Sequence, residues 1–393
     1  MTGRHRCCAN DGGRFVRVLA AAVKRPAGLP RWEQFDGAAA VPTYLGRVAI
    51  RRLCRDLGLA GGDEILAPSY NCGSEIDPLL AGGASVTLYR VGRDARIDVK
   101  DLADRVTKRT RAVYVTHYFG WAQPLAEVSA LCKSRGLLLI EDCALALFSR
   151  DDLGPVGTTG DAAVFSLRKF LPVPDGGVLC LRGRDTTEGM RSPPAGRTAR
   201  NMLPLFKSQV FRGLERFGLY SPLRAAMLRR GRVSRTTGAT EGLPDMPADY
   251  YFDAGMEDWS MSSLARGIAA GIDPHAVIDR RRTNYLALAG MTQGLPHVEP
   301  LFRELPEGVC PMAMPILTPR RDAVTASLNA HGIAAFPFWK GYHRGFDWSG
   351  FPDARFLKDH LLTLPVHQSL TIAHMSYIAQ VLSGTVSGPI ALG

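Results

Sequence analysis

The chain of 393 residues lacks the sequence features that mark several protein classes. Its eight cysteines form no CxxC pair and no metal-ligand spacing, so we expect no bound metal and a reducing, cytoplasmic location. No run of about 18 uncharged apolar residues occurs, so a membrane span is not expected. The apolar stretch from Phe15 to Val23 contains Arg17 and no convincing cleavage site, which favours a short helix over a signal peptide.

The composition is that of a large globular protein. Hydrophobic residues make up 46% and charged residues 22% of a chain too long for a single core, which predicts two packed units. The net charge of +11 is concentrated between residues 184 and 235, and the remainder is nearly balanced. A local basic patch explains this distribution better than a groove that follows phosphates, so we expect no nucleic-acid partner.

Residues 47 to 183 alternate helical and strand patterns, which predicts an α/β fold with a mainly parallel sheet covered on both faces. Helical periodicity covers Arg47–Leu57, Asp98–Val106 and Leu125–Ser134. Short apolar runs predict strands at Glu64–Ala67, Ser85–Tyr89, Ala112–Thr116, Leu137–Glu141, Ala162–Leu167 and Val178–Leu181. Right-handed crossovers place the carboxyl ends of the parallel strands at one edge, where ligands bind in such folds.

The regular pattern breaks between residues 184 and 255. Within the break, Ser208–Gly218 and Leu223–Arg230 could form short basic helices. We interpret the segment as a solvated insertion; the alternative is a basic surface at residues 190–235 that touches a membrane or an anionic partner.

The pattern after Met261 predicts a smaller α+β unit. Its expected elements are a long helix through Tyr285, a strand near Cys310–Leu317, and helices at Arg321–His331 and Ala373–Leu382. The predicted division of the chain is an N-terminal extension (1–40), a large domain (41–183), the basic insertion (184–255) and a small C-terminal domain (256–393).

Two charged residues close to the ends of predicted strands are the candidates for catalysis. Asp142, in the run IEDCALA, can hold a protonated pyridine nitrogen at the sheet edge, although a helix N-cap is an equally ordinary role. Lys169, in FSLRKFLPVPDGG, follows a predicted strand in a segment whose prolines and glycines prevent a regular helix. A desolvated lysine there can attack an aldehyde and form a Schiff base, whereas a Lys beside an Arg is more often a solvated surface pair.

The same edge carries residues that could hold a phosphate and cover a ring. Leu45-Gly46-Arg47 opens the first predicted helix, where free amides favour an anion, and Ser166 can add a hydroxyl. The predicted ring covers are Tyr70, Cys72 and His117, each of which is also an ordinary core or loop residue.

The order and spacing of these motifs resemble the DegT/StrS family of sugar aminotransferases, which depend on pyridoxal 5'-phosphate (PLP). The runs that carry the resemblance are YLGRVAI, GGDEILAPSYNC, THYFG, LLLIEDCALA and GDAAVFSLRKFLPVPDGG, within residues 44–182, and it resumes over residues 261–370. The resemblance implies the fold-type-I PLP transferase architecture. That architecture has a large domain with a mainly parallel seven-stranded sheet between helices, and a smaller C-terminal α+β domain.

The resemblance also assigns roles. It implies that Lys169 forms the Schiff base, that Asp142 pairs with the pyridinium nitrogen, and that Gly46, Arg47 and Ser166 surround the phosphate. Three departures from the family pattern bear on the site: Cys72 stands where an aromatic residue stacks on the ring, Leu145 where Gln contacts the phenolic oxygen, and residues 258–261 read DWSM near the family's Asn-x-Arg-Met. The segment before Lys169 is also shorter than the family's common FSFHxTK form.

The implied activity is transfer of an amino group, with glutamate as the expected donor, to a nucleotide-linked keto sugar in polysaccharide or secondary-metabolite biosynthesis. Lys169 would move the proton between substrate and cofactor, and a homodimer would complete each site. Two alternatives stay open. One is a PLP enzyme that acts on another carbonyl compound or eliminates water, and the other is a non-catalytic protein that acts by interaction through the basic insertion.

Overall fold

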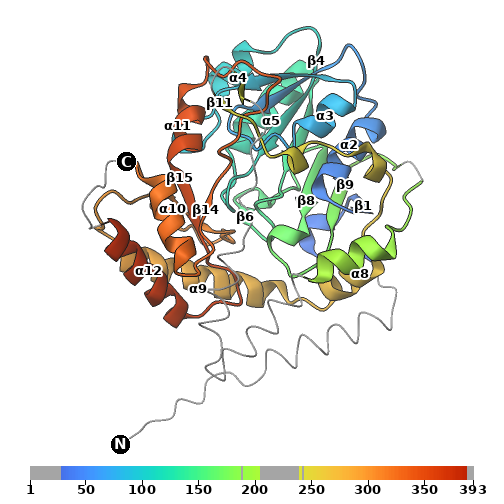
Figure 1. Ribbon diagram of the computed structural model, residues 1–393. Coiled ribbons are helices and arrows are strands. Elements are labelled where there is room, and N and C mark those ends of the chain that lie inside the picture. Colours follow the sequence, from blue (N-terminus) through green and yellow to red (C-terminus); the bar gives the residue numbers. More distant parts are fainter. Residues whose placement is uncertain (1–27, 187–188, 204–238, 241–242, 387–393) are drawn as a thin grey trace, which may run out of the picture.

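The computed structural model describes residues 28–186, 189–203, 239–240 and 243–386 (Figure 1). None of the helices in these ranges combines the length and apolarity that crossing a bilayer requires. The predicted basic helices at 208–218 and 223–230 lie outside the described residues.

A seven-stranded sheet forms the centre of the larger unit, in the order β1-β9-β8-β5-β4-β2-β3. Its strands are β1 (Ala39–Thr43), β2 (Glu64–Pro68), β3 (Ser85–Tyr89), β4 (Thr110–Thr116), β5 (Leu138–Asp142), β8 (Ala162–Ser166) and β9 (Gly177–Leu181). Only β9 pairs antiparallel, with β1 on one side and β8 on the other. The predicted mainly parallel sheet is therefore confirmed.

The predicted strands occur within two residues of their expected bounds, but β1 was not predicted. Its sequence AAVPT is short, and Pro42 cannot donate to a strand ladder. The structure places β1 at the edge of the sheet, paired only with β9, where a proline is tolerated. The predicted boundary at residue 40 consequently falls inside this strand.

Helices cover the sheet, and α2 matters most for the site. The helices of this part are α2 (Gly46–Asp56), α3 (Asp77–Ala81), α4 (Val99–Asp104) and α5 (Leu125–Arg135). Val48, Ile50 and Leu53 form much of the buried face of α2, which packs across β1, β8 and β9 (Figure 1). This packing fixes the start of α2 beside the end of β8.

The C-terminal part contains a second, four-stranded sheet in the order β12-β13-β15-β14, whose paired strands are all antiparallel. Its strands are β12 (Glu299–Pro300), β13 (Met314–Leu317), β14 (Phe336–Pro337) and β15 (Leu361–Leu364). The accompanying helices are α10 (Arg321–Ala330), α11 (Pro352–His360) and α12 (Ile372–Val386). The predicted strand near 310–317 and the helices near 321–331 and 373–382 are present.

The long helix expected through Tyr285 is present as α9, but it does not extend back to Met261, because a separate helix precedes it. Helix α8 (Ser263–Ala270) is followed by Gly271 as its C-cap, and α9 (Pro274–Thr292) begins three residues after that glycine. The side chain of Asp273 accepts a hydrogen bond from the amide of His275, and Pro274 occupies the first turn. An N-cap followed by proline starts a new helix and cannot continue an old one.

One hydrophobic cluster joins the two sheets. It contains Leu66 and Val113 of the large sheet together with Ile316 and Leu362 of the small one. A second cluster includes Phe165 and residues of α8. The proposed division of the chain into domains stays a prediction, because side chains of both units share a core.

The other elements whose two ends both lie in the described residues are short. They are β6 (Arg150–Asp151), β7 (Gly154–Pro155), β10 (Ala239–Thr240), β11 (Leu243–Pro244), and the 3-10 turns η1 (Glu33–Phe35), η2 (Leu167–Lys169), η3 (Ala248–Tyr250) and η4 (Ala254–Met256).

Candidate active site

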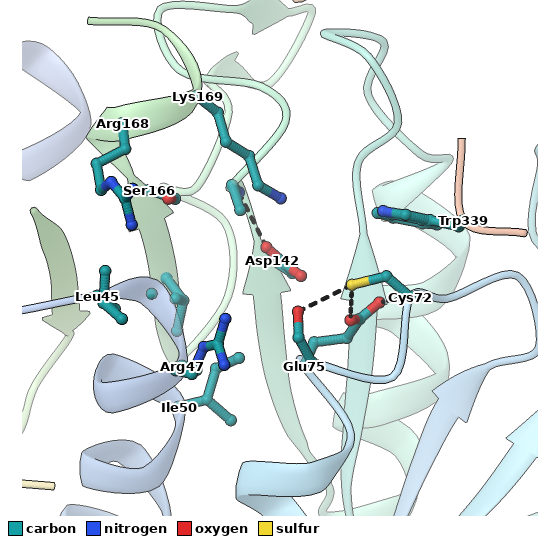
Figure 2. Close-up of a pocket in the computed structure, with 14 residues that line it drawn as sticks. Leu45, Arg47, Ile50, Cys72, Glu75, Asp142, Ser166, Arg168, Lys169 and Trp339 are labelled. Carbon is teal, nitrogen blue, oxygen red and sulfur yellow. Dashed lines mark hydrogen bonds between the residues drawn. The ribbon is translucent and has the colours of Figure 1, made fainter. Parts of the chain in front are cut away.

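A cavity of about 300 Å³ lies between the start of α2 and the ends of β5 and β8 (Figure 2). It brings together most of the predicted site residues, namely Gly46, Arg47, Cys72, Asp142, Ser166 and Lys169. Figure 2 shows Arg47, Ser166 and Arg168 on one side of the cavity and Cys72, Glu75 and Trp339 on the other, with Asp142 and Lys169 between them.

Lys169 is the last residue of η2, the single turn that follows β8. Its side chain extends into the cavity (Figure 2) and makes no hydrogen bond or ion pair with the described residues. The turn is anchored at its base, because the amide of Leu167 donates to the carbonyl of Gly176 at 3.0 Å. The backbone of the turn thus positions the lysine, and its amine has no hydrogen-bond or ion-pair partner among the described residues.

Asp142 ends β5 and faces the same cavity, with 5% of the residue exposed. One carboxylate oxygen accepts the amide of Ala144 at 2.9 Å, and no helix follows, so the alternative N-cap role is not what the structure contains. Burial raises the pKa of Asp142, and Glu75 raises it further, whereas Lys169 and the Ala144 amide oppose the rise. The hydroxyl of Tyr114, buried beside Asp142, also lowers the pKa of this carboxyl by hydrogen bonding.

The end of the cavity near α2 favours an anion. Gly46 and Arg47 occupy the first turn of α2, where amides have no intrahelical partner, and Leu45 provides no side-chain cap. Ser166 lies beside Gly46: a methyl group built on the glycine would come 3.5 Å from the serine Cβ. The guanidinium of Arg47 is already engaged, since it donates to the carbonyls of Asp249 and Tyr251.

Arg168 also lines the cavity, although it is not among the predicted site residues. It makes no hydrogen bond or ion pair with the described residues, and burial lowers its pKa, with the charge of Arg47 adding to that effect. The pair Arg168-Lys169 had been considered as a solvated surface pair. In the structure both residues are exposed to solvent, and both also line the cavity. The adjacency of two cations at a strand end was the signal that could have identified Arg168.

The two glycines of the DGG run explain how this end of the cavity is built. Gly176 has a φ of 134°, which side-chain-bearing residues rarely adopt. A Cβ on Gly177 would lie 2.4 Å from the carbonyl group of Leu45, so only glycine lets β9 approach the residue before α2. The start of α2 and the Lys169 turn are consequently held together through backbone.

The opposite wall consists of Cys72, Glu75 and Trp339, of which only the cysteine was predicted. The carboxylate of Glu75 accepts both the amide of Cys72, at 3.0 Å, and its thiol. Burial raises the pKa of Cys72 to about 12, and the charge of Glu75 adds to the rise. Trp339 reaches this wall from the segment after β14 and has a φ of 57°. Its partners are far away in sequence, so no local pattern indicated it.

The structure does not bring Tyr70 or His117 to the cavity as ring covers. Tyr70 is fully buried, packs against the rings of Tyr118 and Trp339, and donates its hydroxyl to the carbonyl of Phe338. His117 is also fully buried. These side chains form part of the packing behind the wall.

His117 belongs to a buried polar network around Glu141. Its Nδ1 accepts the amide of Gln123 at 3.0 Å, so Nε2 carries the proton and donates to Glu141 at 3.1 Å. Burial alone would raise the pKa of Glu141, but hydrogen bonds from His117 and from the amides of Gly157 and Gly160 lower it overall. Cys143 lies within 4.8 Å of the two side chains, yet their polar atoms are already satisfied by protein groups.

Leu145 and residues 258–261, the other two departures from the family pattern, are packed within the protein. Leu145 is buried in the main hydrophobic cluster and does not line the cavity. Near residues 258–261, the ring of Trp259 packs edge-on against Tyr44 and its carbonyl accepts the Tyr44 amide at 2.8 Å. Asp258 forms an ion pair with Arg191 at 2.8 Å. Both residues thus have partners within their own chain.

Comparison with known sequences gives a consistent picture. Residues 37–196 match the DegT/DnrJ/EryC1/StrS aminotransferase family. The GDP-perosamine synthase of Vibrio cholerae is 31% identical over 137 residues, 34% of this chain and 37% of that protein. The dTDP-4-dehydro-2,3,6-trideoxy-D-glucose 4-aminotransferase of Saccharopolyspora spinosa is 31% identical over 34% of this chain and 36% of its own. These matches therefore span little more than a third of the relatives' lengths.

Solved structures resemble nearly the whole chain. The aminotransferase PseC of Helicobacter pylori, involved in pseudaminic acid biosynthesis, covers 96% of this chain and 97% of its own with a TM-score of 0.66 at 16% identity. The Streptococcus pneumoniae putative sugar aminotransferase Spr1654, in its apo form, covers 95% of each chain with a TM-score of 0.68 at 15% identity. At these identities the likeness establishes the fold, which is the predicted fold-type-I aminotransferase architecture.

Proposed function

Residues 37–196 belong to the DegT/DnrJ/EryC1/StrS aminotransferase family, and from this membership and the cavity geometry we propose that the chain is a PLP-dependent aminotransferase. The observation that carries the proposal is the convergence of a free lysine amine, a buried carboxylate and an anion-binding helix start on one cavity. Each group matches one part of the cofactor: its aldehyde, its ring nitrogen and its phosphate.

The donor set fits PLP. Asp142 is a buried carboxylate that the amide of Ala144 orients, and it faces a cavity containing Lys169. The phosphate end of the cavity offers positive potential and hydrogen-bond donors that are available to an anion. They come from Arg168, Ser166 and the first amides of α2. In this proposal Lys169 holds the aldehyde carbon covalently, Asp142 binds the protonated ring nitrogen, and the Gly46 end binds the phosphate.

PLP, when bound, supplies an electron sink that stabilises the negative charge left when the α-proton of an amino donor departs. Asp142 would favour the protonated form of the ring nitrogen, because the negative charge of its carboxylate stabilises an adjacent cation. The amine of Lys169, which lies in the same cavity, would move the substrate proton as general base and then general acid.

The names of the relatives support a nucleotide-linked keto sugar as the amino acceptor. The synthase and the 4-aminotransferase reported above carry GDP- and dTDP-linked sugars in their names. The Bacillus subtilis spore coat polysaccharide biosynthesis protein SpsC, 24% identical over 53% of this chain, supports a role in polysaccharide biosynthesis. We propose glutamate as donor, a homodimer and a cytoplasmic location; membrane-surface contact through residues 190–235 stays a hypothesis.

Borohydride trapping tests the proposal directly. Purified protein incubated with PLP and reduced with borohydride should yield one labelled peptide, with the label on Lys169. Adding glutamate before reduction should convert the visible absorbance of the bound cofactor to that of its amine form and abolish the label. A label on another lysine, or no label, would contradict the assignment of the site.

The glutamate step also separates transamination from the alternative of water elimination. Conversion by glutamate followed by recovery of the original absorbance with a nucleotide-linked keto sugar supports amino transfer. Binding of PLP with no conversion by any amino donor would favour another reaction, for which the buried Leu145 and the segment 258–261 are the motivating differences. Binding of a partner without any reaction of the cofactor would favour the second alternative, a non-catalytic protein that acts by interaction.

A further inference from the structure

One peptide group on the cavity wall is held from both of its ends. The carbonyl of Asn71 accepts a hydrogen bond from the ammonium of Lys358 at 2.6 Å. The amide of Cys72, which belongs to the same peptide unit, donates to the carboxylate of Glu75 at 3.0 Å. A cation therefore binds the negative end of this peptide dipole and an anion its positive end, and both interactions are of the stronger, charge-assisted kind.

Lys358 is an unusual residue to find in a core. It lies on α11, is fully buried, and shares no ion pair with the described residues. Its ammonium donates to two further carbonyls, those of Trp339 at 3.1 Å and Gly341 at 2.8 Å. The rings of Tyr342 and Trp348 lie 5.1 and 4.9 Å away. All three ammonium protons are used on backbone carbonyls, and two of these carbonyls belong to the segments that form the Cys72 wall.

Glu75 is committed to the same wall. Both of its carboxylate oxygens bind Cys72, one through the amide and one through the thiol, and the residue is 4% exposed. A buried charge is costly unless it is bonded, so a core built for stability alone would be served by an apolar residue at either position. The common effect of the two charges is to fix the backbone that carries Cys72 and Trp339.

We propose that Lys358 and Glu75 act as a clamp of two positioning residues that fixes Cys72 and Trp339 on the cavity wall facing the cofactor ring. This inference rests on the proposed function and deepens it. On this wall a small thiol, that of Cys72, lies beside a ring from the C-terminal part, that of Trp339. A small side chain cannot lock itself in place by packing, so the clamp on its backbone performs that task.

The test compares Lys358→Met, Glu75→Gln and the double variant with two controls at exposed positions, Lys340→Met and Glu127→Gln. The first readout is the alkylation rate of Cys72 in the PLP-free protein, resolved by peptide mapping. Loss of a nearby cation by itself makes a thiol less reactive, because the thiolate loses a stabilising charge. Release of the clamp has the opposite sign: in Lys358→Met we expect alkylation to rise about tenfold or more.

The second readout is the affinity for PLP together with the visible circular dichroism of the bound cofactor, which reports how the ring is held. Each single variant should weaken PLP binding about tenfold and change the dichroism. The loss of affinity in the double variant should be smaller than the product of the two single losses, because both substitutions disrupt the same clamp. The two controls should match the wild type in both measurements.

The outcomes distinguish this inference from the proposed function. Failure of the wild type to bind PLP at Lys169 would overturn the proposed function, yet the alkylation rates would still test the clamp. An alkylation rate at or below wild type in folded Lys358→Met overturns the clamp, as does unchanged PLP affinity and dichroism in both single variants. If Lys358→Met shows no cooperative unfolding transition, Glu75→Gln decides: wild-type affinity and dichroism in that variant overturn the inference.

Discussion

The two walls of the cavity are built in different ways. The wall around Lys169 consists of residues that immediately precede or follow α2, β8 and β9, and its contacts are made by backbone close to those elements. The wall around Cys72 depends on Trp339 and Lys358, which meet the Cys72 segment across the interface of the two sheets. The first wall is a property of the large sheet, whereas the second exists only when both units have packed.

The largest expected effect concerns the reacting group of the first wall. Lys169→Ala should abolish borohydride trapping and lower the amino-transfer rate by about 10²- to 10⁴-fold, because both covalent attachment and proton transfer are lost. The measurement is the rate of cofactor conversion by the amino donor. Lys133→Ala, at an exposed position on α5, is the control and should retain the wild-type rate. Undiminished conversion in Lys169→Ala would show that the chemistry lies elsewhere.

The buried lysine of the second wall, Lys358, should make the free energy of unfolding depend on pH. Burial lowers the pKa of Lys358 from its ordinary value of 10.5 to about 8, although Cys72, Glu75 and Asp359 oppose the shift. Between these values the folded protein binds fewer protons than the unfolded chain at this site, so its contribution to the free energy of unfolding rises with pH. The shift corresponds to about 3 kcal/mol, an order-of-magnitude figure.

Denaturant unfolding across this pH window measures the effect as the difference between wild type and Lys358→Met. The stability of the wild type should rise relative to that of the variant as pH increases from about 8 to 10.5. Lys340→Met, whose lysine is exposed, should follow the wild type throughout. A difference that stays constant over the window would mean that Lys358 titrates normally.

Arg168 tests whether the first wall binds the phosphate. Arg168→Met should weaken PLP binding about 10- to 100-fold, the range expected when a hydrogen bond to a charged group is lost. Alkylation of Cys72 should not change, because the arginine lies on the opposite wall (Figure 2). Arg96→Met serves as the exposed control. Equal PLP affinities measured by absorbance titration would remove Arg168 from the site.

The smallest expected effect tests the backbone of the first wall. Gly177→Ala places a Cβ 2.4 Å from the Leu45 carbonyl group, and the resulting displacement should lower the free energy of unfolding by about 1–3 kcal/mol. PLP affinity should fall with it, while Cys72 alkylation stays the same. Gly384→Ala in α12, where a Cβ meets nothing within 4 Å, should leave stability equal or slightly higher. A stable Gly177→Ala protein would show that the close approach is not required.

The sequence was informative where local chemistry determines structure. Buried parallel strands are continuous apolar runs, so β2, β3, β4 and β5 were predicted nearly to the residue, and Asp142 and Lys169 follow from their positions at or just past strand ends. The edge strand β1 was missed because Pro42 and a short apolar run resemble a loop. The break between α8 and α9 was missed although Asp273-Pro274 is a recognisable helix start.

The sequence was least informative where distant segments meet. Glu75 and Trp339 carried no local signal, because their roles arise from contacts with Cys72 and with the packed C-terminal part. Tyr70 and His117 were correctly expected near strand ends, but their side chains are buried in the packing behind the wall. Position along a strand could be predicted, whereas the direction of a side chain beyond its end required the three-dimensional packing.

The late position of Trp339 and Lys358 in the chain has a consequence for biosynthesis. As the polypeptide leaves the ribosome, the large sheet is complete once residue 181 has emerged, while the residues that finish the cavity follow more than 150 positions later. A nascent chain can therefore present its reactive lysine before the site is closed on the other side. If the chain binds PLP as proposed, productive binding would require these later residues to have emerged and packed.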